Sequence, residues 1–433
     1  MERHLTVFHS LEFLGEIRRS PGRKVWVPDA PSSSVYIEHL LELTENDGVV
    51  LHLEDIFPDI KEEYSKTDIQ AFSVSHLDLS SKKVSRIAFY PQSDTLAVSA
   101  QKIYRNLDPE TTWILTPQKD TEGVRDFLTS GNIPHEIYRF KTLRRLKPDA
   151  LVLFNDWTKE AQRIMAHCHL LGIPVICIQE SVIDFGDSSR RMQHADYAFV
   201  QGSSTFSELV REVLFITGNP RYVDLTNNKP RNPDDPVLIN CNFTYDIHEN
   251  VRYNWLDQIT KQLDDLQIDY QITQHPRDRG DLSRYKNARK ISTGSVHDMI
   301  RSSSVLITRF SSLIHEALIM GVPVIYHNPH RESMQYDFQC NDIFLQMTYT
   351  DGDLKDAILN LRKKEYFEGL ESYLAKHCLT ISPAPTTNIA FLLANSSLLE
   401  SRFRIIDLVR LIIFMPFIRN VYYWVKGIFT RSK

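Results

Sequence analysis

Short apolar runs alternate with segments of helical periodicity along the first half of the chain. Several of these runs are rich in β-branched residues and lack strict alternation of apolar and polar positions, which is typical of parallel strands buried on both faces. The expected strands cover residues 24–30, 48–54, 85–91, 111–117, 149–155, 174–180 and 197–202. Helical periodicity between them, as in residues 94–107 and 157–172, predicts a doubly wound α/β domain.

The pattern breaks at residues 216–236, which are rich in Pro, Asn and charged residues and form the predicted interdomain linker. Beyond the linker the same pattern restarts on a smaller scale. The expected strands there cover residues 237–243, 270–276, 288–292, 304–310 and 323–329, and the expected helices cover 249–266, 295–303 and 311–321. We therefore expect two doubly wound domains, at residues 1–222 and 223–395. A last helix after residues 382–388 could also return to the first domain.

The last part of the chain differs in composition from the rest. Residues 402–433 contain seven Lys or Arg and one acidic residue among many aliphatic and aromatic ones. Their longest run without a charge, residues 411–418, is too short to span a bilayer, which takes ~20 apolar residues. This composition predicts a basic amphipathic tail, residues 396–433, that lies in the membrane interface. The alternative is a terminal helix that folds back onto the body of the protein.

Bulk composition narrows the class of protein. A length of 433 residues exceeds what one hydrophobic core usually serves, which supports two domains. A net charge of −5 argues against nucleic-acid binding through overall charge. The five cysteines are scattered without a CxxC pair, as expected for reduced thiols in a cytosolic protein. The first 20 residues lack an uninterrupted apolar core, so we expect no secretory signal.

Candidate chemistry begins in the stretch from Val305 to Pro329, "VLITRFSSLIHEALIMGVPVIYHNP". An apolar strand there delivers Arg309, Ser311 and Ser312 to the start of a helix, where unpaired N–H groups attract anions. Glu316 follows on nearly the same helix face and could accept hydrogen bonds from a ribose diol. The alternative interpretation is that Ser311 only caps the helix.

A second candidate lies in "YQITQHPRDRG", where a predicted strand ends in His275, Pro276 and Arg277. Proline stops the strand ladder after the histidine and leaves the imidazole at the edge of the sheet. Histidine can hydrogen-bond or protonate a phosphate leaving group near neutral pH. A His-Pro pair alone is a weak signal and is better explained as a structural turn.

The order of these motifs resembles the C-terminal domain of bacterial surface-polysaccharide glycosyltransferases of the GT-B type. The resemblance is greatest to the CMP-Kdo-dependent retaining β-Kdo transferases of lipopolysaccharide and capsule synthesis, and CDP-glycerol glycerophosphotransferases carry a similar pair of motifs. It rests on His-Pro-Arg at 275–277, on Ser-Ser-x-x-x-Glu-Ala from Ser311, and on the flanking motifs "ITGNPRY" and "VLINCNFTYD". It covers roughly residues 150–330 and leaves about the first 85 residues unassigned.

The resemblance implies a fold of two facing Rossmann-like domains and a function. A glycosyltransferase of this kind moves Kdo from CMP-Kdo to a lipid-linked O-antigen or capsule acceptor, as a peripheral protein on the cytoplasmic face of the plasma membrane. The residues that would bind the nucleotide are His275, Arg277, Arg309, Ser311, Ser312 and Glu316. The resemblance implies no metal ion and no other cofactor.

A catalytic carboxylate is expected in the first domain, directly after the strand that ends "CIQESVIDFGD". Glu180 is the first choice as general acid or base, and Ser181, Asp184 and Asp187 follow in the same loop. The alternative is that Glu180 is a loop carboxylate bonded to backbone amides.

The glycosyl nucleophile is the point at which the sequence departs from the family. The retaining β-Kdo transferases use an aspartate near the strand that follows the linker, but this chain has Asn240 and Asn242 there, and its nearest acid is Asp246. An amide cannot form the glycosyl ester. Either Asp246 reaches the site, the enzyme uses another mechanism, or the chain is a substituted variant.

Other functions remain open at this stage. They are a CDP-glycerol-type polyol-phosphate transferase, a nucleotide-sugar epimerase, and a catalytically degenerate binding subunit of a polysaccharide assembly complex. "DGD" at 351–353 imitates a metal-binding Asp-x-Asp but is better explained as a turn and helix cap. The basic cluster at residues 140–147 is either a solvated helix face or a patch for an anionic acceptor or lipid.

Overall fold

The computed structural model divides into two compact units. The first unit comprises residues 1–180, 187–221 and 381–433, and the second comprises residues 181–186 and 222–380. The structure describes residues 3–10, 22–28, 33–44, 49–54, 69–72, 85–186, 189–209, 211–225, 232–244, 247–275, 277–285, 288–290, 293–378, 384–401 and 407. Asp187, Asp246 and nearly all of the predicted tail therefore lie outside the described residues. Within the described ranges, no helix combines the length and the apolar character needed to cross a membrane.

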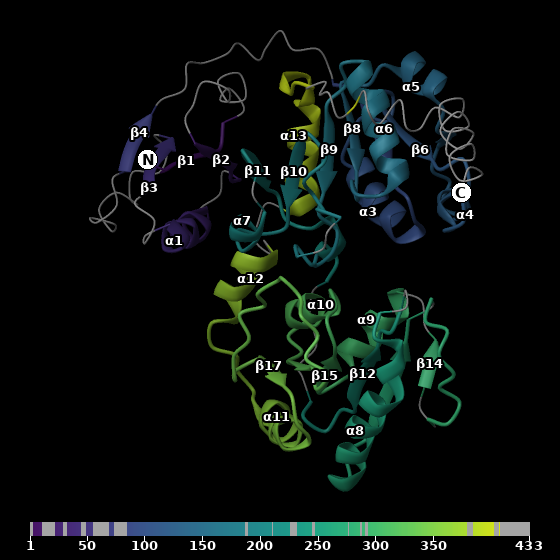
Figure 1. Ribbon diagram of the computed structural model, residues 1–433, viewed down its shortest axis with the longest axis vertical. Helices are drawn as coiled ribbons and strands as arrows, with labels where there is room; N and C mark the ends of the chain where they lie inside the picture. The colour runs from purple at the N-terminus through teal and green to yellow at the C-terminus, as the bar shows by residue number, and fades with distance from the viewer. Residues whose placement is uncertain are drawn as a thin grey trace, which may run out of the picture. The chain divides into compact units, whose positions relative to one another are not determined.

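The first unit is built on one parallel sheet of eleven strands (Figure 1). Its strands are β1 Arg3–Phe8, β2 Arg23–Trp26, β3 Val49–Glu54, β4 Ile69–Phe72, β5 Ile87–Tyr90, β6 Thr112–Thr116, β7 Glu136–Ile137, β8 Ala150–Leu153, β9 Val175–Ile178, β10 Tyr197–Val200 and β11 Val213–Ile216. Its helices are α1 Ser33–Thr44, α3 Asp94–Tyr104, α4 Val124–Ser130, α5 Phe140–Leu146, α6 Lys159–Leu170, α7 Thr205–Glu208 and α13 Pro385–Ala394, with 3₁₀ turns at Pro220–Tyr222 and Ser396–Leu398. The strand order is β4-β3-β1-β2-β11-β10-β9-β8-β5-β6-β7.

The first strands of the chain extend this sheet beyond a conventional doubly wound core. β2 pairs with β11 in parallel, with Val25 opposite Leu214, and so joins β1–β4 to the edge of the other seven strands. The sequence pattern predicted β2 and β3 but missed β1, β4, β7 and β11. β7 has only two residues, too few for any periodicity, whereas β1, β4 and β11 are as long as strands that the pattern did predict.

The helix α13 corrects the predicted limit of the second domain. The sequence assigned residues 223–395 to that domain, but residues from 381 onward belong to the first unit. Ile389 and Leu393 of α13 are buried in the same apolar cluster as Phe154 and Ile178 of the first sheet. Burial of this apolar face determines where the helix packs.

The second unit is a smaller parallel sheet in the order β14-β13-β12-β15-β16-β17. Its strands are β12 Val237–Cys241, β13 Tyr270–Gln274, β14 Ala288–Lys290, β15 Val305–Thr308, β16 Val324–His327 and β17 Leu345–Thr348. Its helices are α8 Arg252–Asp265, α9 Thr293–Arg301, α10 Leu313–Ile319, α11 Asp351–Lys363 and α12 Leu370–Cys378, with a 3₁₀ turn at Glu249–Val251. Trp255 of α8 and Leu354 of α11 share one apolar cluster with Ile239 and Ile307 of the central strands.

Candidate functional site

The chain reverses its direction of winding between β12 and β15 in the second unit. From β12 it proceeds to β13 and β14 on one side, and β15, β16 and β17 then extend the sheet on the other. In open α/β sheets, ligands bind outside the carboxyl ends of the strands at such a switch point. Asn242 follows β12, His275 follows β13 and Arg309 follows β15, so three of the residues predicted from sequence lie at this edge.

His275 is held in a defined orientation by the turn that follows β13. Its backbone N–H donates to the carbonyl of Cys241 at 3.3 Å, and its Nδ1 accepts from the backbone N–H of Arg277 at 3.1 Å. Because Nδ1 is an acceptor, the neutral ring carries its proton on Nε2. The half-buried imidazole can therefore act as a hydrogen-bond donor through Nε2.

Arg309 is buried, with only 3% of its surface exposed. Its Nε and Nη2 donate to Oε2 of Glu332 at 3.1 and 2.5 Å, and its Nη1 donates to the carbonyl of Asn242 at 2.8 Å. The guanidinium thus joins the ends of β12 and β15 to the loop after β16. This position favours a role in shaping the edge of the sheet, and the direct phosphate contact expected from sequence stays a prediction.

Glu332 completes that ion pair and was missed by the sequence analysis. Its Oε1 accepts from the backbone N–H of Phe310 at 2.9 Å and from the hydroxyl of Tyr326 at 3.0 Å. Burial alone would raise the pKa of the Glu332 carboxyl, but Arg309 and these hydrogen bonds outweigh burial and hold it below the ordinary value. Glu332 is therefore an ionised carboxylate inside the protein.

Two histidines approach the same carboxylate. Nε2 of His330 lies 3.5 Å from Oε2 of Glu332, and Nε2 of His248 lies 3.9 Å from the same oxygen. Histidine and carboxylate are metal ligands, and one ligand atom from each of the three residues falls within 4.8 Å of the others. Both oxygens of Glu332 already accept hydrogen bonds, however, and a cation would lie beside the Arg309 charge. The Arg309 charge therefore disfavours a metal ion here, although both ring nitrogens of His330 are buried without a hydrogen-bond partner among the described residues.

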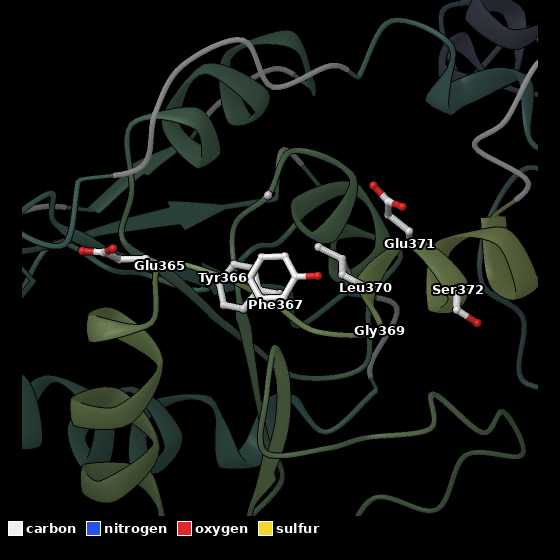
Figure 2. Close-up of a pocket in the computed structure, with 8 residues that line it drawn as sticks. Glu365, Tyr366, Phe367, Gly369, Leu370, Glu371 and Ser372 are labelled. Carbon is white, nitrogen blue, oxygen red and sulfur yellow. The ribbon is translucent and has the colours of Figure 1, made fainter.

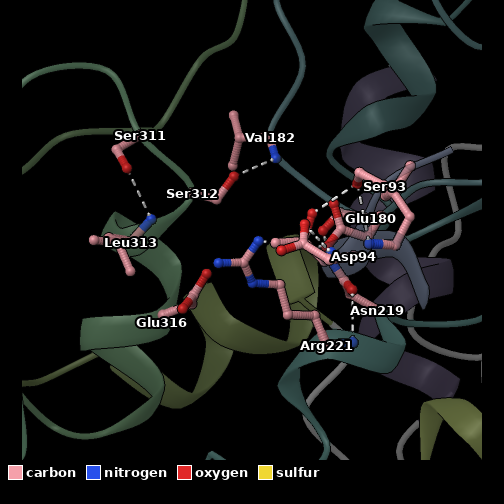
Figure 3. A network of polar contacts seen from close by, with 12 residues as sticks. Ser93, Asp94, Glu180, Val182, Asn219, Arg221, Ser311, Ser312, Leu313 and Glu316 are labelled. Carbon is pink, nitrogen blue, oxygen red and sulfur yellow. Dashed lines mark hydrogen bonds and ion pairs between the residues drawn. The ribbon is translucent and has the colours of Figure 1, made fainter. Parts of the chain in front are cut away.

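The two serines lie at the start of α10, as the sequence predicted. Oγ of Ser311 accepts from the backbone N–H of Leu313 at 3.2 Å, and Oγ of Ser312 accepts from the backbone N–H of Val182 at 3.0 Å (Figure 3). A hydroxyl that accepts in this way keeps its own hydrogen for donation. The serines can therefore combine a local structural role with hydrogen bonding to an anion.

Glu316 is fully buried on α10, on the side that meets α9. Its Oε2 lies 2.5 Å from Nε2 of His297. The Glu316 carboxylate therefore bonds to a neighbouring helix. Its contact with a ribose diol stays a prediction.

The asparagines after the linker have different environments. Asn240 is buried within the sheet, where its Nδ2 donates to Oγ1 of Thr308 at 2.9 Å and its Oδ1 accepts from Oγ1 of Thr273 at 3.4 Å. Asn242 is half-buried at the carboxyl edge. Of the two, Asn242 is the one placed to meet a ligand.

A buried ion pair supports the turn that carries His275. Nη2 of Arg252 donates to Oδ1 of Asp278 at 2.8 Å, and Oδ2 of Asp278 accepts from the backbone N–H of Phe243 at 3.3 Å. A Cβ at Gly280 would lie 2.5 Å from the Arg252 guanidinium, so a larger residue here would displace that side chain. These contacts join the loops after β12 and β13, and sequence alone does not indicate them.

In the first unit, Glu180 follows β9 at the carboxyl edge of the large sheet. Its Oε1 lies 3.4 Å from Nη1 of Arg221, and its backbone carbonyl accepts from Nδ2 of Asn219 at 3.0 Å (Figure 3). Asn219 also donates to Oε1 of Gln201 at 3.2 Å, which connects the loops after β9, β10 and β11. Glu180 is thus a largely buried carboxylate beside a cation, and its role as a general acid or base stays a prediction.

The neighbouring residues of that loop belong to the second unit. Oδ1 of Asp184 accepts from the backbone N–H groups of Gly186 at 3.0 Å and Gln335 at 2.9 Å. These bonds explain Asp184 as a structural carboxylate, in contrast to Glu180.

A hollow of about 590 Å³ in the second unit lies away from these residues (Figure 2). It is lined by Gly321, Glu365, Tyr366, Phe367, Gly369, Leu370, Glu371 and Ser372. Gly321 precedes β16, so the hollow is at the amino-terminal edge of the sheet and includes none of the predicted site residues.

Comparison with known proteins places the fold. No protein-family model matches the chain, and no curated protein sequence matches it. The UDP-GlcNAc 2-epimerase of Methanocaldococcus jannaschii, solved with UDP-GlcNAc and UDP, is 14% identical with a TM-score of 0.53, over 72% of this chain and 99% of that one. The MnaA–UDP co-structure from S. aureus is 13% identical with a TM-score of 0.50, over 77% of this chain and 99% of that one. These likenesses show the fold, which is of the GT-B type with Rossmann-like α/β domains, as the sequence predicted.

Proposed function

We propose that this protein is a glycosyltransferase that moves Kdo from CMP-Kdo to a lipid-linked O-antigen or capsule acceptor, as a peripheral protein on the cytoplasmic face of the plasma membrane. The observation that carries the proposal is the position of the β12–β15 switch point, where Asn242 and Arg309 meet and His275 is one strand away. The motifs that resemble those of Kdo transferases thus occupy the ligand-binding edge of an α/β unit. The similar structures carry UDP-GlcNAc and UDP, which supports a nucleotide-activated sugar as the substrate class.

In this proposal, the phosphate of CMP is bound by donors that follow β13 and β15. Nε2 of His275, the guanidinium of Arg277 and the hydroxyls of Ser311 and Ser312 supply these donors. Arg309 has a supporting role in this proposal. Its guanidinium is already paired with Glu332, and it holds the backbone at Asn242 beside these donors. The site needs no metal ion, so a chelator should leave the rate unchanged.

The chemistry breaks the bond between the anomeric carbon of Kdo and the phosphate oxygen of CMP. His275 donates a hydrogen bond from Nε2 to the departing phosphate, which stabilises the charge that develops there. Glu180 accepts the proton of the acceptor hydroxyl as that oxygen forms the new glycosidic bond. Direct attack by the acceptor requires no enzyme ester, which agrees with an amide at Asn242. Asp246 is the alternative nucleophile for a double displacement.

A product assay tests this proposal. The full chain is incubated with CMP-Kdo and membranes that contain lipid-linked polysaccharide, and the glycan is analysed by mass spectrometry for an added Kdo. The Glu180→Gln variant serves as the catalytic control. Kdo on the glycan with release of CMP supports the proposal. Hydrolysis of CMP-Kdo without transfer, or no reaction, contradicts it.

A nucleotide-sugar epimerase is the second candidate, because the Methanocaldococcus jannaschii structure is named a UDP-GlcNAc 2-epimerase and carries UDP-GlcNAc and UDP, and the S. aureus structure carries UDP. An epimerase would convert UDP-GlcNAc to its C2 epimer without any acceptor. Incubation with UDP-GlcNAc alone, followed by NMR of the sugar, distinguishes the two functions.

A further inference from the structure

One face of the first unit, formed by α5 and the end of α6, combines cations with exposed apolar side chains. We call it the α5 surface. Its exposed basic residues are Arg139, Lys141, Arg144, Arg145 and Lys147, and its exposed apolar residues are Ile137, Phe140 and Leu170. All residues that define the α5 surface are described residues.

The charge of the α5 surface is largely uncompensated. Arg145 pairs with Glu136 at 2.6 Å, and both side chains are exposed. The other four cations form no ion pair with a carboxylate anywhere in the described part of the chain. The nearby Asp149 is occupied by the backbone N–H of Arg86, which donates to its Oδ2 at 2.7 Å. The α5 surface therefore presents a concentrated positive field.

Its apolar side chains are unusually accessible for their size. Ile137, Phe140 and Leu170 are 37%, 36% and 53% exposed. The ring of Phe140 lies with its centroid 4.9 Å from that of His167 on α6, which holds it at the surface of the unit. A purely solvated basic face needs no such side chains, whereas a bilayer interface accepts both phosphate-binding cations and partly inserted apolar groups.

A hollow lies beside these residues. It has a volume of about 480 Å³ and is lined by the cations Arg144 and Lys147, by the polar residues Asp149 and Ser397, and by apolar side chains that include Leu171 and Leu399. The two cations can bind a lipid phosphate, because Asp149 already accepts the backbone N–H of Arg86.

We propose that the α5 surface binds anionic phospholipid bilayers. Lys147 and Arg144 contact lipid phosphates, while Phe140 and Leu170 enter the region between headgroups and acyl chains. A nucleic acid would use the same cations and can stack a base on Phe140, but it offers no partner for the aliphatic side chains of Ile137 and Leu170. The inference goes beyond the proposed function and does not depend on it, because lipid binding is measured without substrate.

The test is co-sedimentation of the full chain with vesicles of phosphatidylcholine, with or without phosphatidylglycerol as the anionic component. Arg144→Glu with Lys147→Glu should raise the lipid concentration for half-maximal binding about 30-fold or more, since each basic residue near an anionic bilayer contributes about fivefold. Phe140→Ser with Leu170→Ser should also weaken binding. The matched control, Lys355→Glu with Lys363→Glu on α11, makes the same change in net charge and should bind like the unaltered protein.

Each outcome decides the proposal. Loss of binding in both α5 variants, with unchanged melting temperatures and an unaffected control, supports it. Unchanged binding in the α5 variants overturns it and assigns any membrane affinity to another part of the chain. A loss confined to the charge variant, with equal loss of binding to single-stranded RNA, also overturns it and indicates a general polyanion surface.

Discussion

The Arg309 guanidinium and the Glu332 carboxylate form a buried ion pair that joins the end of β15 to the loop after β16. Arg309 also bonds the carbonyl of Asn242 beyond β12, so one side chain holds three neighbouring strand ends in register. This buried ion pair therefore stabilises the strand ends at the switch point of the second unit.

Removal of one partner should destabilise this unit strongly. Glu332→Ala leaves the Arg309 charge buried without its partner, which typically costs about 3–5 kcal/mol. Urea denaturation of the full chain measures the change. The control Glu368→Gln alters an exposed carboxylate and should have little effect. If Glu332→Ala lowers the free energy of unfolding no more than the control does, the ion pair does not stabilise this unit.

The Glu332 carboxylate should also make the stability of the second unit sensitive to acid. The pKa of Glu332 is lowered in the folded protein, so its contribution to stability is present above the ordinary carboxyl pKa of 4.5 and is lost as pH falls through the lowered value. Melting temperatures measured over this acid range should fall more steeply for the unaltered protein than for Glu332→Gln. Parallel curves would show that Glu332 titrates normally.

The stability of the first unit should have the opposite pH dependence, because of His169. Its Nε2 and Nδ1 lie 2.9 Å from carboxylate oxygens of Asp196 and Asp407, and these acids raise its pKa although burial alone would lower it. The contribution of this cluster to stability is full below pH 6.5 and is lost as pH rises through the raised folded pKa. Asp407→Asn should lower the melting temperature at acidic pH and reduce its fall toward alkaline pH. Identical pH profiles would rule out a charged His169.

Ser311 and His275 should contribute to nucleotide affinity, and their local hydrogen bonds to Leu313 and Arg277 should contribute less to the stability of the fold. Ser311→Ala and His275→Ala each remove one hydrogen bond to phosphate, which should weaken binding about 10- to 100-fold. Isothermal titration calorimetry with CMP measures the change, and His135→Ala on the first unit is the control. Normal affinity in both variants would place the nucleotide elsewhere.

Glu180 should matter for turnover and not for donor binding. Glu180→Gln keeps the side-chain shape but cannot accept a proton, so kcat should fall roughly 10²–10⁴-fold. The affinity for CMP should stay the same. Glu110→Gln, an exposed change in the same unit, is the matched control. A small rate change in Glu180→Gln would return that residue to a structural role beside Arg221.

The sequence predicted the second sheet and the residues at its carboxyl edge because parallel strands end where their apolar runs end. That rule located Asn242, His275 and Arg309 on adjacent strands. It did not reveal Glu332, because an ion pair between residues 23 positions apart in the chain leaves no periodic pattern. Hydrophobic periodicity predicted α13 and left open whether it returns to the first domain, since an apolar helix face does not identify its partner.

The most direct test of the account is a thermal-shift series of the full chain with CMP, CDP, UDP, GDP and ADP. A ligand that binds only the folded state raises the melting temperature by mass action. The account predicts selective stabilisation by CMP that is lost in Ser311→Ala. No shift with any nucleotide, or an equal shift in the variant, would contradict a donor site at the β12–β15 switch point, and a preference for UDP or CDP would contradict CMP-Kdo as the donor.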